Sequence, residues 1–108
     1  MTNTPNSFAT ICTKQCKQEL IGFLLSLSIH HPNSKTFIIC DTETQKYLLE
    51  SSLKPKLKLK IFNELDEFSS FNRAEMERRN IFGKFLSYKM KCLKYAITEC
   101  GDSMFVDS

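Results

Sequence analysis

The sequence predicts an α/β fold in three layers, with a mainly parallel sheet between two layers of helices. Two short runs of β-forming apolar residues, Phe8–Cys12 and Thr36–Cys40, are each followed by a polar residue. Between these runs, leucine and phenylalanine recur at the spacing of an amphipathic helix. Strands that alternate with helices of this length need crossover connections, which favour parallel pairing, and the right-handed crossover rule leaves few arrangements.

The composition indicates one globular unit, or part of one. The chain has 108 residues, of which 42% are hydrophobic, and nine phenylalanines, which is enough apolar material for one core. Its net charge is +3, and the fifteen Lys and Arg are interspersed with twelve Asp and Glu, so we expect no nucleic-acid partner. The longest apolar stretch, residues 21–27, contains Gly22 and Ser26 and is far shorter than the ~20 residues of a membrane span.

Residues 1–7 are polar and are expected to form an N-terminal tail without a signal peptide, with the domain at 8–108. An odd number of cysteines without a CxxC pair favours reduced thiols in a cytoplasmic protein over a disulfide framework. A zinc site could be built from Cys12, Cys16, His30 and His31, but two closely spaced ligand pairs are missing. Buried thiols and a histidine pair at a helix end are therefore the preferred interpretation. The cysteines are Cys12, Cys16, Cys40, Cys92 and Cys100.

The first helix follows from four apolar residues at positions i, i+3, i+4 and i+7. These residues are Leu20, Phe23, Leu24 and Leu27, and Pro32 stands just beyond the last expected turn. A second helix is expected after Asp41, in TETQKYLLESSL. Thr42 or Thr44 could cap this helix, and residues 47–49 (YLL) supply its apolar face.

The third strand is expected in KLKLKIF, residues 56–62. Lysine alternates with apolar residues here, which puts Lys56, Lys58 and Lys60 on one face of a strand. Such lysines could form a phosphate-binding patch, but a solvated edge strand guarded by lysine is the preferred interpretation.

After an acidic and aromatic loop at Asn63–Asn72, a long helical segment is expected at Arg73–Cys100, with a break near Gly83. A fourth strand, Met104–Val106, follows. Lys89 falls within the broad apolar face of the last helix, where its stem could either pass along the core or serve a site. The other members of that face are Phe82, Phe85, Leu86, Met90, Leu93, Ala96, Ile97 and Cys100.

The rise per residue of a helix places Lys89 roughly 16 Å above the end of the last helix. The rise of a strand brings Asp107 back by roughly 13 Å, so the two residues are expected at about the same level. Ligands of open parallel sheets bind outside the carboxyl ends of the strands where the strand order reverses, so we expect the first and fourth strands to be neighbours. The strands end at Thr13, Asp41 and Asp107. A cation and two carboxylates at this edge suit a phosphate-bearing ligand with Mg²⁺ or Mn²⁺.

The order FATICT, helix, FIICD, then FGKFLSYKMKCLKYA leading into MFVDS resembles the N-terminal half of a nucleotide-diphospho-sugar glycosyltransferase of the Rossmann-like GT-A fold. Within this family, the order of these segments is most similar to that of the glycogenin-like transferases. The resemblance covers Phe8 to Ser108. It implies transfer of a sugar from a nucleotide-diphosphate donor to an acceptor hydroxyl on a glycan, protein or lipid, with Mn²⁺ or Mg²⁺.

The resemblance also implies roles for particular residues. Nucleotide binding is assigned to Thr10, Ile11, Cys12, Thr13, Lys14 and Lys89. Asp107 corresponds to the first residue of the metal-binding D-x-D triplet, Ser108 to the second, and the third would be position 109. The chain is therefore expected to be a fragment that is inactive on its own.

A different class of protein is the alternative. A flavodoxin-like or receiver-like interaction module would use Asp41 and Asp107 as an acidic regulatory pocket, without sugar chemistry. Such modules usually carry a lysine late on a strand, whereas Lys89 is predicted on a helix, which favours the transferase.

Overall fold

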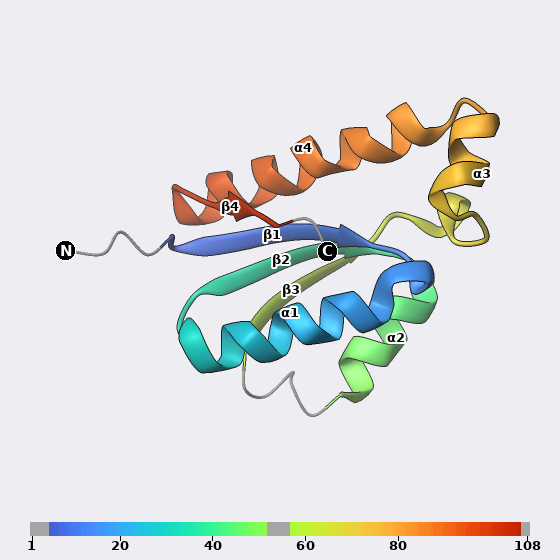
Figure 1. The fold of residues 1–108 in the computed structure, drawn as a ribbon. Coiled ribbons are helices and arrows are strands. Elements are labelled where there is room, and N and C mark those ends of the chain that lie inside the picture. Colours follow the sequence, from blue (N-terminus) through green and yellow to red (C-terminus); the bar gives the residue numbers. More distant parts are fainter. Residues whose placement is uncertain (1–4, 52–56, 107–108) are drawn as a thin grey trace.

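The computed structural model describes residues 5–51 and 57–106, and it has the three-layer α/β architecture that the sequence predicts (Figure 1). In this part of the chain, four strands form one parallel sheet in the order β3-β2-β1-β4. The strands are β1 (Ser7–Cys12), β2 (Lys35–Cys40), β3 (Lys58–Asn63) and β4 (Met104–Phe105).

Strand β1 is one of the two inner strands, and it pairs with β2 on one edge and β4 on the other. Its register pairs Cys12 with Cys40 of β2 and Phe8 with Met104 of β4. The chain therefore builds the sheet outward from β1 in one direction and then returns to the opposite side of β1 for β4. The expectation that the first and fourth strands are neighbours is confirmed, and the strand order reverses between them.

Two helices cover one face of the sheet. Helix α1 (Lys17–His30) buries Leu20, Leu24 and Leu27, and helix α2 (Thr42–Glu50) buries Leu48 (Figure 1). These side chains form one apolar cluster with alternate residues of the strands. The helix that the leucine and phenylalanine spacing predicts is thus confirmed, and the His31 amide closes its last turn on the Leu27 carbonyl at 2.8 Å.

Helix α4 (Phe82–Cys100) covers the opposite face, and the short helix α3 (Arg73–Arg78) lies at its N-terminal end (Figure 1). The side chains on this face form a second apolar cluster. It includes Phe68, from the short 3-10 turn η3 (Asp66–Phe68), and Met76 of α3.

In the described residues, no helix is both long enough and apolar enough to cross a membrane.

The second helix differs from its expected form in its cap and its apolar face. Asp41, rather than Thr42 or Thr44, is the N-cap, and its carboxylate accepts from the Thr44 amide at 3.0 Å. Tyr47 and Leu49 are exposed. Consecutive helical residues point about 100° apart, so residues 47–49 cannot share one buried face.

The long helical segment breaks at Asn80, not at Gly83. Asn80 has φ 58°, a left-handed conformation that asparagine tolerates better than most residues, and Gly83 lies inside α4. Helix α3 starts with a capping box in which Asn72 and Glu75 bond each other's backbone amides. The break allows α3 to fold over the end of the sheet instead of extending α4.

Helix α4 is rotated from the expected orientation. Cys92 and Ala96 are its fully buried residues, whereas Met90 is 69% exposed and Ile97 is 48% exposed. The Cys92 sulfur lies 3.4 Å from the carbonyl oxygens of both Thr10 in β1 and Phe37 in β2, which share its single S–H. Small side chains at the contact let the helix approach the sheet closely, so the contact is centred on them and not on the larger apolar residues.

The edge position of the lysine-rich strand is confirmed. Lys58 and Lys60 of β3 are exposed, while Leu59 and Ile61 point to the α1 side and pack against its cluster. Lys60 lies 3.7 Å from Glu99 of α4. Lys56 is outside the described residues.

Leu24→Ala should lower the free energy of unfolding by roughly 2–5 kcal/mol, because Leu24 is fully buried and its loss leaves a cavity. Leu25→Ala is the matched control, since Leu25 is 49% exposed on the same helix, and it should change stability by less than about 1 kcal/mol. Urea denaturation of both variants measures the difference. Equal losses would mean that α1 does not pack on the sheet through Leu24.

Candidate functional site

A cavity of about 500 Å³ opens at the carboxyl end of β1, beneath α3 and the first half of α4. Its lining combines aromatic and aliphatic side chains with polar and charged ones. Residues of β1, the 3-10 turn η1 (Lys14–Cys16) and the two helices contribute to it. The lining comprises Ile11, Cys12, Thr13, Gln15, Cys16, Phe71, Asn72, Arg73, Met76, Phe82, Phe85, Leu86 and Lys89.

Two cations border this cavity. Lys89 of α4 is half-buried, and its ammonium lies 5.2 Å from the centre of the Phe105 ring in β4. The guanidinium of Arg73, the first residue of α3, lies 4.9 Å from the Phe82 ring centre. The Arg73 Nε also bonds Glu77 at 3.1 Å. Arg73 was not among the site residues expected from the sequence, because helix propensity does not show that α3 turns toward the strand ends.

The expected nucleotide-binding residues divide into two groups. Ile11, Cys12, Thr13 and Lys89 line the cavity together. Thr10 is fully buried, and its hydroxyl donates to the Val106 carbonyl at 2.9 Å.

Neither Thr10 nor Lys14 belongs to the cavity lining, and the Lys14 side chain is exposed to solvent. The backbone amide of Lys14 bonds Asp41 at 2.9 Å. Asp107 and Ser108 lie outside the described residues.

Asp41 connects three segments at the carboxyl edge of the sheet. One carboxylate oxygen accepts from the Thr44 amide, and the other accepts from the Lys14 amide and from the Ser69 hydroxyl at 2.8 Å. The residue is fully buried. Burial alone would raise the pKa of its carboxyl, but hydrogen bonds from Thr44, Lys14 and Ser69 outweigh it and leave this pKa below its usual value.

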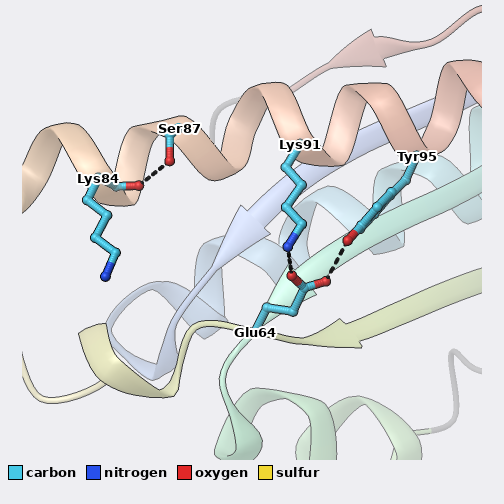
Figure 2. A network of polar contacts seen from close by, with 5 residues as sticks. All are labelled: Glu64, Lys84, Ser87, Lys91 and Tyr95. Carbon is cyan, nitrogen blue, oxygen red and sulfur yellow. Dashed lines mark hydrogen bonds and ion pairs between the residues drawn. The ribbon is translucent and has the colours of Figure 1, made fainter.

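A second polar group joins the end of β3 to α4. Figure 2 shows Glu64 accepting from the Lys91 ammonium and from the Tyr95 hydroxyl, the latter at 3.0 Å. The backbone amide of Glu64 bonds the Cys40 carbonyl at 3.0 Å. This network fixes the middle of α4 above the sheet, and the position of the helix in turn sets where Lys89 lies.

The described residues contain no group of three or more His, Cys, Asp and Glu side chains placed to hold a metal ion. His31 packs against Phe8, with 5.4 Å between the ring centres, and all five cysteines are free thiols. The centre expected for Mn²⁺ or Mg²⁺ was assigned to Asp107, which is outside the described residues, so it stays a prediction.

No protein-family model matches the sequence, and comparisons with curated proteins and with solved structures gave no significant match.

Asp41→Ala should lower the free energy of unfolding at neutral pH by roughly 2–4 kcal/mol, because it removes a helix cap and leaves the Lys14 amide and Ser69 hydroxyl without this acceptor. Glu43→Gln, at an exposed position of the same helix, is the control and should have little effect. Thermal denaturation of both variants checks the prediction, and an unchanged melting temperature for Asp41→Ala would contradict it.

The same carboxylate should make stability depend on pH. Its folded-state pKa is below the unfolded value near 3.8, so its contribution is complete above that value and is lost as the pH falls through the folded-state pKa. Between about pH 5 and pH 2, urea denaturation should therefore show a smaller loss of stability in Asp41→Ala than in the wild type. Parallel pH profiles would show that Asp41 has no depressed pKa.

Proposed function

We propose that this chain binds the nucleoside diphosphate part of a nucleotide-sugar donor in the cavity at the end of β1. The activity proposed for the protein is transfer of that sugar to an acceptor hydroxyl. The proposal rests on one observation. Lys89, Cys12 and Thr13 line the same cavity, which lies beside the point where the strand order reverses.

The chemistry of the cavity suits such a ligand. Its aromatic side chains Phe71, Phe82 and Phe85 offer surface to a flat base or a sugar ring. Lys89 and Arg73 offer positive charge to phosphate oxygens. In a transfer reaction the diphosphate gains negative charge as it leaves the sugar. A fixed ammonium at Lys89 would stabilise that charge in the transition state more than in the ground state.

In this proposal, the residue that would hold a divalent metal ion is Asp107. Mn²⁺ or Mg²⁺ would neutralise diphosphate charge there when bound. The five free thiols are in keeping with a reducing, cytoplasmic setting, which is also part of the proposal.

The alternative is a flavodoxin-like or receiver-like regulatory module built around an accessible acidic pocket. Asp41 is the described member of that pocket, and its side chain is fully buried and accepts hydrogen bonds from three protein groups. A carboxylate so engaged is poorly placed to accept a phosphoryl group or to hold a metal. This observation favours the nucleotide-binding proposal.

Calorimetric titration of the 108-residue chain with uridine and guanosine diphosphates, with and without Mn²⁺, tests the proposal. Lys89→Ala should weaken binding of the preferred nucleotide about tenfold, because it removes a cation beside the phosphates. Lys94→Ala is the control, since Lys94 lies on the same helix outside this cavity, and it should leave affinity nearly unchanged. Absence of binding up to millimolar nucleotide by folded protein would favour the regulatory module.

Asp107→Asn tests the metal separately. It should abolish the increase in nucleotide affinity caused by Mn²⁺ while leaving metal-free binding and the melting temperature unchanged, because a carboxylate ligand contributes mainly to the metal. The corresponding variant of an exposed carboxylate, Glu43→Gln, is the control. A lower melting temperature for Asp107→Asn would indicate a structural role instead.

A further inference from the structure

Three cysteines gather at the carboxyl edge of the sheet. Cys12 and Cys40 are the last residues of β1 and β2, are partners in the register, and are both buried in the cluster beneath α1. Cys16, at the end of η1, packs against the same cluster and is only partly buried. One accessible thiol therefore lies beside two inaccessible ones.

Cys16 and Cys12 are also brought together by the turn between them. The Cys16 amide donates to the Thr13 carbonyl at 3.0 Å, which folds η1 back onto the end of β1, and both cysteines line the cavity. The Cys12 thiol donates to the Thr13 carbonyl at 3.1 Å. Both cysteines thus belong to one short turn that lines the proposed site.

We propose that Cys16 and Cys12 form a redox-sensitive dithiol, which a peroxide oxidises to a disulfide. The Cys16 sulfur attacks the peroxide oxygen, the O–O bond breaks, and the products are a sulfenic acid and water. The Cys12 sulfur then attacks the Cys16 sulfur, and the hydroxyl leaves with the Cys12 proton as a second water. A soluble thiol reverses the reaction by reducing the disulfide.

The environment sets which thiol reacts first. Burial, and then Glu19, raises the pKa of Cys16, so the thiolate is a minor form at neutral pH and its oxidation is slow. Burial raises the pKa of Cys40 to about 12, and the Cys40 side chain is inaccessible to solvent. Burial, and then Cys16, also raises the pKa of Cys12, whose side chain is buried as well. Cys16, which is partly exposed, is therefore the first of these three thiols to react. Cys12, in the same turn, is the neighbour that resolves its sulfenic acid.

Closing this bond would alter the site. The turn that it would constrain carries the bond from the Lys14 amide to Asp41 and forms one side of the cavity. We expect the oxidised protein to bind nucleoside diphosphate at least tenfold more weakly. This consequence rests on the proposed function, whereas formation of the disulfide does not.

Tryptic mapping can assign the bond without ambiguity, because trypsin cuts after Lys14 and Lys17. Cys12 then lies in peptide 1–14, Cys16 in 15–17, and Cys40 in 36–46. After hydrogen peroxide treatment at about pH 8.5, where more thiolate is present, the chain should lose about 2 Da and yield peptide 1–14 linked to 15–17. Dithiothreitol should release the two peptides.

Variants decide whether the proposal holds. Cys16→Ser should abolish the linked peptide, while Cys100→Ser, at the other partly buried cysteine, should leave it unchanged. Recovery of Cys16 from the wild type as an unlinked sulfinic acid, or a wild-type link between peptides 1–14 and 36–46 in place of the one to 15–17, would overturn it.

Titration of the reduced and the oxidised wild type with uridine and guanosine diphosphates separates the two proposals. A disulfide in a protein that binds no nucleotide in either state would refute the proposed function and leave the dithiol standing. Nucleotide binding by a protein that forms no disulfide would support the proposed function and refute the dithiol.

Discussion

The rest of the structure depends on the burial of β1 on both edges and both faces. Every residue of this strand is buried, including Ser7 and Thr10, whose hydroxyl groups cannot reach water. Both find their acceptors in the last described segment, Ser7 in the Asp102 carbonyl at 2.7 Å and Thr10 in the Val106 carbonyl. The need to satisfy two buried hydroxyls therefore holds the C-terminal segment against the first strand, although β4 itself has only two residues.

The position of the cavity follows from this arrangement. Because β4 returns beside β1, helix α4 must cross the sheet before it, and its N-terminal half reaches the carboxyl ends of the strands. Buried Asp41 joins η1 to the loop that carries Ser69, which precedes α3. Asp41 thus links the turn on one side of the cavity to the loop that carries Phe71 and leads into α3, so local stability and the geometry of the cavity are coupled.

Much of the fold could be predicted from the sequence, because its main signals are local. Alternating strands and helices, the periodicity of α1 and the lysines of the edge strand each depend on spacing within a few residues. The position of Lys89 beside the end of β1 could also be derived, since helix and strand rises are nearly constant.

Other features depend on contacts that spacing does not show. Helix α4 is oriented by the Cys92 thiol against two strand carbonyls, and a cysteine carries little weight in a hydrophobic pattern. Asn80 breaks the helix through a left-handed backbone conformation that glycine would more often adopt. Arg73 joins the cavity because of that break, so its place could not be inferred without it.

The anchoring of α4 at Cys92 has a consequence for how the length of this segment can vary. The direction of Lys89, on the N-terminal side of the anchor, follows from the helical phase counted from Cys92. One residue inserted between Lys89 and Cys92 would swing the lysine about 100° around the helix axis and carry its ammonium away from Phe105. An insertion before α4 would leave the phase between Lys89 and Cys92 intact, so it should be selected against less strongly than an insertion within the helix.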